Sequence, residues 1–380
     1  MPFLPTPRLL SQLTNRAIIY SQNGDPSKVL TSLRYPELPP PASETVNIKF
    51  LLAPINPADI NVVEGVYPSK PTEETSLTTS GKGSPEQPVF VGGNEGLARV
   101  TAIGNGVGDL KLDDWVVMTK PQSGTWCTSR NVHASDIIKV PWRHGLSQVH
   151  AATMTVNPPT AYNMLRDFTS LKEGDWIVQN GANSAVGQAV IQIAASKGLK
   201  TLNFVRNRDN IRNLVDDLQS LGATKVLTYD ELSDKSLRTR LKEWTGERSI
   251  SLGLNCVGGN ETSLMARLLG NDAHLVSYGA MSKQPLSLPT SLFIFKNITS
   301  HGFWQTRWYQ NRSPKEKYDV MKILVDLMVT GKLKEPRHEI LYIAAHESDT
   351  EAGQKIKDAI RNMSEGQHGK KVLLRLESLE

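Results

Sequence analysis

Short apolar runs and helical segments alternate between about Trp176 and Trp304, and this alternation limits the possible folds more than any other feature of the sequence. It predicts a parallel sheet with helices on both faces. Six strands in this order predict a complete doubly wound sheet of the Rossmann type, an α/β dinucleotide-binding fold. The expected strands are Trp176–Asn180, Thr201–Arg206, Lys225–Tyr229, Leu252–Val257, His274–Tyr278 and Thr299–Phe303, and the expected helices are Ala185–Lys197, Asn210–Leu221, Asp234–Trp244, Glu261–Leu269 and Thr290–Phe295.

Three of these helices are followed by a glycine, at Gly198, Gly222 and Gly270. Glycine readily adopts the left-handed conformation that ends a helix. We therefore expect all three glycines to act as helix caps.

Residues 1–155 have a different character, because Pro and Gly separate their apolar runs. This pattern predicts a mostly β domain. Residues 71–88 are polar and predict a long loop. In the last part of the chain, we expect a helix over Glu316–Val329 and a strand near Lys371–Leu376. The strands expected in the first part are Ala17–Ser21, Val46–Leu52, Val89–Val91, Leu97–Ile103, Trp115–Thr119 and Ile137–Val140.

Composition excludes several classes of protein. The chain has 380 residues, enough for two or three domains. No apolar run approaches the ~18 residues of a membrane-spanning helix. The net charge of +5 is too small to indicate a nucleic-acid-binding protein. The two cysteines, Cys127 and Cys256, are too few for a disulfide framework or a zinc site of four thiolates.

The composition of the N-terminal segment indicates a possible targeting sequence. Residues 1–24 contain Arg8 and Arg16, and no acidic residue precedes Asp25. This bias is typical of a mitochondrial transit peptide, here covering the first ~15 residues. A short tail before a strand at Ala17–Tyr20 would have the same composition, so both interpretations stay open.

The segment Trp176–Gly187 (WIVQNGANSAVG) predicts a nucleotide-binding turn between a strand and a helix. In such turns, helix N-terminal amides bind a pyrophosphate. Gly181 and Gly187 are present, whereas Ser184 replaces a middle glycine. A serine hydroxyl can itself donate to a phosphate oxygen.

The end of the second expected strand predicts which cofactor binds. An NAD site carries an acidic residue about 20 residues beyond the glycines. This sequence has Arg206-Asn207-Arg208 there. Guanidinium groups pair with a phosphate, so we expect NADPH, held by its 2′-phosphate. Asp209 could serve a ribose hydroxyl instead after a small shift in register.

The order of the domains resembles the medium-chain dehydrogenase/reductase superfamily. Gly93-Asn94-Glu95-Gly96 matches the place where its zinc enzymes carry Gly-His-Glu, and Asn94 replaces the histidine ligand. No cysteine stands in Ile55–Asn61, near the place of the first zinc thiolate. The resemblance therefore implies a zinc-free member, with no metal at the catalytic site.

A closer resemblance, to the mitochondrial trans-2-enoyl-thioester reductases, covers nearly the whole chain. The sequence departs from the family pattern at Ala280, usually glycine, and at Asn207, where Arg-Asp-Arg is common. The matching blocks are Pro54–Pro71 (PINPADINVVEGVYPSKP), Asn180–Gly198, Asn255–Gly259 (NCVGG), Tyr278–Pro285 (YGAMSKQP) and Phe293–Trp304 (FIFKNITSHGFW).

The resemblance implies NADPH-dependent reduction of 2-enoyl thioesters, carried on CoA or acyl carrier protein, in the mitochondrial matrix during fatty acid synthesis. It implies a homodimer that associates through the nucleotide-binding domains. The expected organisation is a β-rich GroES-like catalytic domain over residues 1–155, a Rossmann NADPH-binding domain over 156–304, and a return to the catalytic domain over 305–380.

Tyr67 is the expected catalytic residue, because without zinc an acidic O–H group is needed near the reacting carbons. Gly65 and Pro68 favour a tight turn around it. A packing role is the alternative for this tyrosine. The residues expected to bind the cofactor are Asn157, Asn183, Ser184, Ala185, Val186, Arg206, Asn207, Arg208, Tyr278, Gly279, Ala280, Met281, Phe303, Trp304, Gln305, Thr306 and Lys370.

Several of these assignments have structural alternatives. Asn157 could be a helix N-cap, Trp304 a domain-interface aromatic, and Lys370 a surface lysine. Phe293 and Phe295 could line an acyl tunnel or pack in the core. The basic residues Arg307, Lys315 and Lys317 could contact an acidic acyl carrier protein or form a solvated helix face.

Two other functions remain open at this point. An NADPH:quinone reductase would share the zinc-free core and would not need Tyr67 as a proton donor. A non-catalytic NADPH-binding regulator is compatible with the pI near 9.0, although no nucleic-acid-binding motif supports it.

Overall fold

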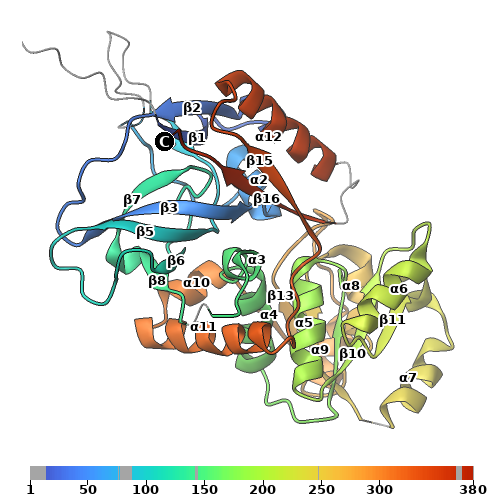
Figure 1. Cartoon of the computed structure of the whole chain (residues 1–380). Helices are drawn as coiled ribbons and strands as arrows, with labels where there is room; N and C mark the ends of the chain where they lie inside the picture. Colours follow the sequence, from blue (N-terminus) through green and yellow to red (C-terminus); the bar gives the residue numbers. More distant parts are fainter. Residues whose placement is uncertain are drawn as a thin grey trace, which may run out of the picture. The chain divides into compact units, whose positions relative to one another are not determined.

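A computed structural model describes residues 14–75, 77, 88–141, 144–246, 248–364 and 370–379 of the chain. The chain forms two compact units. The first unit comprises Met1–Thr155 and Glu335–Glu380, and the second comprises Val156–Lys334. Figure 1 shows both units and labels many of their elements. The segment predicted as a transit peptide and most of the loop predicted over 71–88 lie outside the described residues.

The second unit contains the predicted doubly wound sheet. All of its neighbouring strands are parallel, in the order β11-β10-β9-β12-β13-β14. With β9 counted as the first strand, this is the Rossmann order 3-2-1-4-5-6. The strands are β9 (Trp176–Gln179), β10 (Lys200–Val205), β11 (Lys225–Thr228), β12 (Ile250–Asn255), β13 (His274–Ser277) and β14 (Thr299–Gly302).

Helices cover both faces of this sheet. Leu202 and Phe204 of β10 pack in one core cluster with side chains of α7, α8 and α9, whereas Val205 packs in another with α5 and α6. Successive strand residues point to opposite faces, so one strand supplies both clusters. The helices of this unit are α4 (Asn157–Asp167), α5 (Ala185–Ser196), α6 (Ile211–Ser220), α7 (Leu237–Thr245), α8 (Gly259–Ala266), α9 (Thr290–Lys296), α10 (Gln305–Gln310) and α11 (Pro314–Val329).

Two of the three predicted glycine caps are confirmed. Gly198 and Gly222 have φ values of +69° and +104° after α5 and α6. The prediction for Gly270 is wrong, because α8 ends earlier, at Ala266, and Gly270 does not adopt a positive φ. Gly270 instead lies in the loop before β13, and its amide donates to the carbonyl of Ile250.

The first unit is built around two sheets. One has the order β2-β1-β4, and the larger has the order β15-β16-β3-β5-β6-β8, with β7 also paired to β3. The final strand β16 pairs antiparallel with β3, so distant parts of the chain share one sheet. The strands are β1 (Asn15–Tyr20), β2 (Thr31–Tyr35), β3 (Thr45–Pro54), β4 (Phe90–Val91), β5 (Leu97–Ile103), β6 (Trp115–Met118), β7 (Ser129–His133), β8 (Ile137–Lys139), β15 (His338–Ile343) and β16 (Lys371–Leu376).

Several elements of the first unit were not expected from sequence. They are the strands β2, β7 and β15 and the helices α1 (Pro26–Val29), α2 (Pro57–Glu64), α3 (Gln148–Ala152) and α12 (Asp349–Ser364). Ala352, Ile356 and Ile360 of α12 are buried at helical spacing, in a cluster with β16.

The segment 305–334, which was expected in the C-terminal return, lies in the second unit instead. Trp308 of α10 donates from Nε1 to Asp167 of α4 at 3.2 Å. Val320, Met321 and Leu324 of α11 are buried. No helix among the described residues is long and apolar enough to cross a membrane. Both cysteines are buried and free.

Candidate active site

The turn between β9 and α5 presents backbone donors at the start of a helix. Ser184 is the N-cap of α5, and its Oγ accepts from the Gly187 amide at 3.0 Å. The amides of Ala185 and Val186, in the first turn, have no intrahelical carbonyl within reach. These amides and the helix dipole favour an anionic group. The Ser184 oxygen therefore caps the helix.

Gly187 allows the helix to approach this turn closely. A Cβ atom at this position would lie 2.6 Å from the carbonyl oxygen of Ala182 and 2.7 Å from its Cα. Because both contacts are with backbone, a side chain here would push α5 away from the turn. Gly187 thus performs the packing role of the last glycine in a dinucleotide-binding turn.

A tyrosine that was not predicted supports the same turn. The Tyr229 hydroxyl, at the end of β11, accepts from the Gly181 amide at 2.9 Å. Burial raises the pKa of Tyr229 to about 12, while the positive charge of Arg206 opposes this shift. Arg206 therefore lies close enough to the turn to act on it electrostatically. The contact could have been predicted from sequence, because a tyrosine ends the third expected strand.

The predicted selectivity residues follow β10. Arg206, Asn207 and Arg208 are all exposed. The Asn207 amide donates from Nδ2 to Asp230 at 2.9 Å, which fixes the middle of the segment. Neither arginine forms an ion pair with any residue in the described part of the chain. Both guanidinium groups are thus free to bind an anionic ligand.

The loop after β13 lies against the end of β12. The amides of Tyr278 and Met281 donate to the carbonyls of Asn255 and Cys256, at 2.9 Å each. The Tyr278 hydroxyl is buried, with no hydrogen-bond partner among the described residues. Burial and the neighbouring Cys256 thiol hold the pKa of this phenol well above its usual value, and the Ser184 hydroxyl acts in the opposite direction. Gly279, Ala280 and Met281 are exposed.

The residues after β14 are placed by a buried polar contact. Trp304 is half-buried at the N-cap position of α10, and Gln305 is buried and accepts from Asn163 Nδ2 at 3.2 Å. Phe303 packs edge-to-face on Phe168, with ring centroids 6.2 Å apart. Thr306 follows in the same helix.

The structure therefore brings four predicted cofactor segments to one edge of one sheet. They follow β9, β10, β13 and β14, whose carboxyl ends share that edge because the strands are parallel. The segments are residues 183–186, 206–208, 278–281 and 303–306.

Two predicted cofactor residues lie elsewhere. Asn157 is the first residue of α4, and Val156 occupies the N-cap position, so the N-cap alternative for Asn157 is wrong. Lys370 is exposed, directly before β16 in the first unit. Their roles toward a cofactor stay predictions.

Tyr67 follows the end of α2 in a turn made possible by Gly65. Gly65 has a φ of +80° and caps the helix. The amides of Val66 and Tyr67 both donate to the Asn61 carbonyl, at 3.0 and 3.2 Å. Tyr67 itself is half-buried. Its backbone is thus fixed to the last turn of α2.

A network of buried polar groups surrounds the other end of α2, and it was not predicted from sequence. Asn56 Nδ2 donates to Glu95 Oε2 at 3.0 Å, and Asn56 Oδ1 accepts from Lys371 Nζ at 2.6 Å. The other Glu95 oxygen accepts from the amide and the hydroxyl of Thr155, at 2.9 and 3.2 Å. The three positions 56, 95 and 371 are far apart in sequence, so only the folded chain reveals the network.

Asp59 completes this network. Its Oδ2 accepts from the Asn56 amide at 2.7 Å, which caps α2, whereas its Oδ1 is buried without a partner among the described residues. Burial raises the pKa of Asp59 to about 7, with a further increase from the charge of Glu95. Burial also lowers the pKa of Lys371. Buried charges of this kind are costly unless they are paired.

The positions related to a zinc site hold hydrogen-bonded amides. Asn94 Oδ1 accepts from the Gln122 amide at 2.7 Å, and Asn56 bridges Glu95 and Lys371. Over the ranges that the structure describes, no group of three or more His, Cys, Asp or Glu side chains could hold a metal ion.

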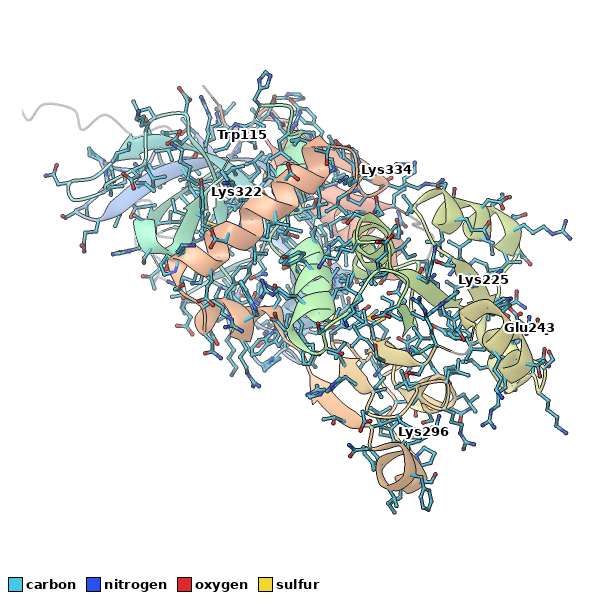
Figure 2. All side chains as sticks on the ribbon, turned by 90° about the horizontal axis from the view of Figure 1, so that it is seen from below. Trp115, Lys225, Glu243, Lys296, Lys322 and Lys334 are labelled. Atoms are coloured by element: carbon cyan, nitrogen blue, oxygen red, sulfur yellow. The ribbon has the colours of Figure 1, made fainter. Side chains whose placement is uncertain are left out.

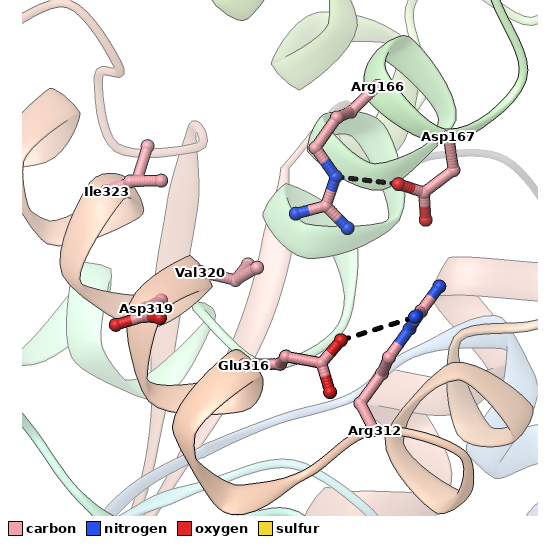
Figure 3. Close-up of a pocket in the computed structure, with 7 residues that line it drawn as sticks. All are labelled: Arg166, Asp167, Arg312, Glu316, Asp319, Val320 and Ile323. Atoms are coloured by element: carbon pink, nitrogen blue, oxygen red, sulfur yellow. Dashed lines mark hydrogen bonds and ion pairs between the residues drawn. The ribbon is translucent and has the colours of Figure 1, made fainter.

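A separate hollow of about 320 Å³ lies on the second unit, between α4 and α11 (Figure 3). Its two arginines pair with carboxylates that also line it: Arg166 with Asp167 at 2.6 Å, and Arg312 with Glu316 at 3.2 Å. None of the predicted site residues lines it. Its arginines are already neutralised by neighbouring carboxylates, unlike Arg206 and Arg208.

Comparison with known proteins identifies the family. The chain is 38% identical over 360 residues to the mitochondrial enoyl-[acyl-carrier-protein] reductase of Schizosaccharomyces pombe, covering 94% of this chain and 93% of that protein. The enzyme of the same name from Yarrowia lipolytica is 45% identical over 302 residues, covering 80% and 76%. The chain belongs to the mitochondrial enoyl-[acyl-carrier-protein] reductase family. The predicted resemblance is therefore confirmed.

Solved structures of this family have the same fold. A complex of Etr1p with NADP and crotonyl-CoA superposes with a TM-score of 0.87 at 35% identity, covering 96% of this chain and all of that one. The Etr1p/Etr2p heterodimer of Candida tropicalis, a mitochondrial 2-enoyl thioester reductase, gives 0.86 at 36% identity, with the same coverage. The predicted fold class is confirmed.

Two more distant matches concern the fold alone. A zinc-binding dehydrogenase family model matches residues 185–324, which include neither Asn56 nor Asn94. The Escherichia coli quinone oxidoreductase, solved with NADPH, has a TM-score of 0.73 at 19% identity, covering 95% of this chain and 99% of that one.

Proposed function

We propose that this protein reduces trans-2-enoyl thioesters to acyl thioesters with NADPH, in the mitochondrial matrix, as a step of fatty acid synthesis. The observation that carries the proposal is the close match, over nearly the whole chain, to a structure that holds both NADP and crotonyl-CoA. The relatives named enoyl-[acyl-carrier-protein] reductase are also named mitochondrial.

The second unit fits the cofactor. The first-turn amides of Ala185 and Val186 suit the pyrophosphate, and Arg206 and Arg208, which form no ion pair with the described residues, suit a 2′-phosphate. The Tyr278 hydroxyl, in the loop after β13, is buried without a hydrogen-bond partner among the described residues and is a further possible donor. When bound, NADPH supplies the hydride of the reaction.

Tyr67 is the proposed proton donor. Reduction adds hydride at Cβ of the substrate and a proton at Cα, and negative charge develops on the thioester oxygen between the two events. A phenol hydroxyl can donate to that oxygen or to Cα. The backbone bonds to Asn61 fix the loop that carries this hydroxyl.

The acyl carrier and the assembly are finer proposals. Arg307 and Lys315 are exposed, and Lys317 is half-buried, on or near α11, where they could contact an acidic carrier protein. Lys315 also pairs with Asp319 at 2.6 Å, so its charge is partly compensated. The CoA thioester is the simplest substrate for a test, because crotonyl-CoA occupies the related structure.

We also propose a homodimer that forms through α9 and β14. Phe293, Ile294 and Phe295 of α9 are exposed, and Ile294 and Phe295 are exposed to 67% and 79%. The prediction that Phe293 and Phe295 pack in the core is therefore wrong for this chain alone. The strand β14 is an open edge of the sheet. At the end of the helix, Lys296 (labelled in Figure 2) donates to the carbonyls of Arg267 and Leu269, which holds α9 in place.

The test is NADPH oxidation by the purified protein, with a trans-2-enoyl-CoA and a quinone assayed side by side. Turnover on the enoyl thioester alone supports the proposal. Turnover on the quinone alone would keep the fold and the cofactor but contradict the reaction. Tight NADPH binding with neither turnover would instead support a non-catalytic role.

A further inference from the structure

We infer that Asn23 and the Asn56–Glu95–Lys371 network are positioning elements that hold the two ends of α2 and thereby place Tyr67 for proton transfer. This inference rests on the proposed function, because it gives α2 a role only if Tyr67 is the donor. Asn23 bonds to backbone carbonyls of α2, so its effect on the reaction would pass through Tyr67.

The N-terminal end of α2 is held by side chains from three distant parts of the chain. Asn56 lies between Glu95 and Lys371 and bonds to both. Asn56 is 4% exposed and Glu95 is fully buried. Since a buried charge with a missing partner is costly, the three groups have one favourable arrangement. That arrangement fixes Asn56, the N-cap residue of the helix.

The C-terminal end is held by a loop that follows β1. Asn23 Nδ2 donates to the carbonyls of Val62 and Val63, at 3.2 and 3.1 Å. The Gly24 amide donates to Val63 at 3.0 Å. The last carbonyls of a helix normally have no intrahelical partner. Here, the Gly65 amide also donates to the Val62 carbonyl, at 3.0 Å, and the loop supplies the donors for Val63.

Gly65 shows how closely this loop and the helix end fit together. A Cβ atom on Gly65 would lie 2.9 Å from Cγ of Asn23. The next two amides, of Val66 and Tyr67, turn back to the Asn61 carbonyl. The Asn23 side chain is therefore in contact with the turn from which Tyr67 extends.

The eight residues of α2 connect the two held ends. A helix this short spans ~12 Å and is marginal without tertiary support. If either end is released, the helix and the turn after it can shift together. A displacement of ~1 Å at a reacting group can cost about 100-fold in rate.

The test compares Asn23→Ala and Asn23→Asp, neither of which can donate to the two carbonyls. Gln22→Ala, an exposed change in the same loop, is the matched control. We expect kcat with a trans-2-enoyl-CoA to fall about tenfold in both Asn23 variants and to stay within twofold in the control. The KM for NADPH should stay within twofold, because the cofactor segments lie in the other unit.

A double-mutant cycle shows whether the effect passes through Tyr67. In a Tyr67→Phe background, Asn23→Ala should change turnover by less than twofold. An equal loss of turnover in both backgrounds would show a general structural role and overturn the inference. An unchanged kcat for Asn23→Ala alone would also overturn it.

Amide hydrogen exchange gives a readout that does not depend on activity. Exchange at Val66 and Tyr67 should become faster in Asn23→Ala but not in Gln22→Ala, and unchanged exchange would count against the inference. Failure of the proposed function would be distinguishable from failure of this inference. It would appear as no turnover of a trans-2-enoyl-CoA by the wild type, or as unchanged turnover in Tyr67→Phe. Asn56→Ala is a second variant, at the N-terminal end of α2. We expect the same fall in kcat, the same KM for NADPH and the same faster exchange at Val66 and Tyr67.

Discussion

The chemistry proposed for this protein depends on one phenol. Tyr67 lies in a turn whose backbone amides bond to the last turn of α2. Asp59 lies in the first turn of the same helix, with one oxygen that caps it and one that is buried and unpartnered among the described residues. The proposed proton donor and a buried carboxyl of raised pKa are thus held by one helix.

Replacement of Tyr67 by Phe removes the hydroxyl and keeps the ring. We expect turnover of a trans-2-enoyl-CoA to fall by at least ~100-fold, the lower range for loss of a general acid. Binding of NADPH, measured by fluorescence titration, should not change. Unchanged turnover would remove Tyr67 from the mechanism and leave it a packing residue.

Because of Asp59, the free energy of unfolding should decrease as pH rises through the mildly acidic range, the opposite of the usual effect of a carboxyl group. The pKa of Asp59 is about 7 in the folded protein and ~3.9 in an unfolded chain. Between these values the folded state holds a proton that the unfolded state has released. The free energy of unfolding therefore falls as pH rises from about 4 to about 7, by up to ~1.4 kcal/mol per pH unit from this group.

Asp59→Asn should remove that contribution while its side-chain oxygen still accepts from the Asn56 amide. The expected result is that the variant gains stability relative to the wild type as pH rises through this range. Denaturant unfolding midpoints at several pH values measure it. Parallel curves for the two proteins would show that Asp59 is already ionised at low pH.

At the level of elements, the cofactor site is an arrangement of strand ends. The turn after β9 offers amides, the segment after β10 offers two exposed cations, and the loop after β13 offers a buried hydroxyl. Each group belongs to a short segment that directly follows a strand of the sheet. The site therefore depends on the sheet order more than on any single side chain.

Arg206 and Arg208 should set the preference for NADPH. Replacing both with Ala removes two positive charges from an exposed segment, so the Kd for NADPH should rise at least ~10-fold. The Kd for NADH should change much less. Arg238→Ala, an exposed arginine on α7, is the control and should affect neither. Equal losses for both cofactors would argue against binding of the 2′-phosphate.

The elements of the second unit could be predicted from sequence because their signals are local. Apolar strands such as β9, helix-ending glycines such as Gly198, and the alternation itself all lie within short windows. The first unit gave weaker signals. The helix α2 is short and contains Val62 and Val63, which have low helix propensity. Its best signal was the Asn56 to Asp59 spacing of a helix cap.

The residues of the candidate site also differ in whether a local sequence motif identifies them. Ser184, Arg206 and Arg208 could be proposed from sequence, because each follows a strand within one motif. Asn23 and Lys371 were not found, because their partners are ~40 and more than 300 residues away. The helix α12 was not predicted either, although the spacing of its buried Ala and Ile residues is a usable helical signal.

At the scale of the whole molecule, the second unit carries a group of exposed apolar side chains on α9. The exposed side chains of α9 lie near the open edge strand β14, and large exposed apolar patches mark interaction sites. The related Candida tropicalis protein was solved as a heterodimer, Etr1p/Etr2p. A second copy of this chain is the partner that we propose for this surface.

Ile294→Asp tests that assembly. A charge on this face should convert a dimer to a monomer, as measured by sedimentation velocity or light scattering. Ile323→Asp, at an isoleucine on α11 that is 40% exposed, is the control and should leave the dimer intact. A wild-type monomer, or a dimer that survives Ile294→Asp, would refute this interface.

The discontinuous first unit has a consequence for biosynthesis. Translation delivers all of Val156–Lys334 before β15, α12 and β16 exist. The nucleotide-binding unit can thus complete its sheet on the ribosome or behind an import channel, while the first unit still lacks two strands. Tyr67 is made early, but Lys371, which bonds to Asn56 at the start of its helix, emerges ~300 residues later. The turn that carries Tyr67 is therefore fully supported only after β16, the last strand to be synthesised, has paired with β3.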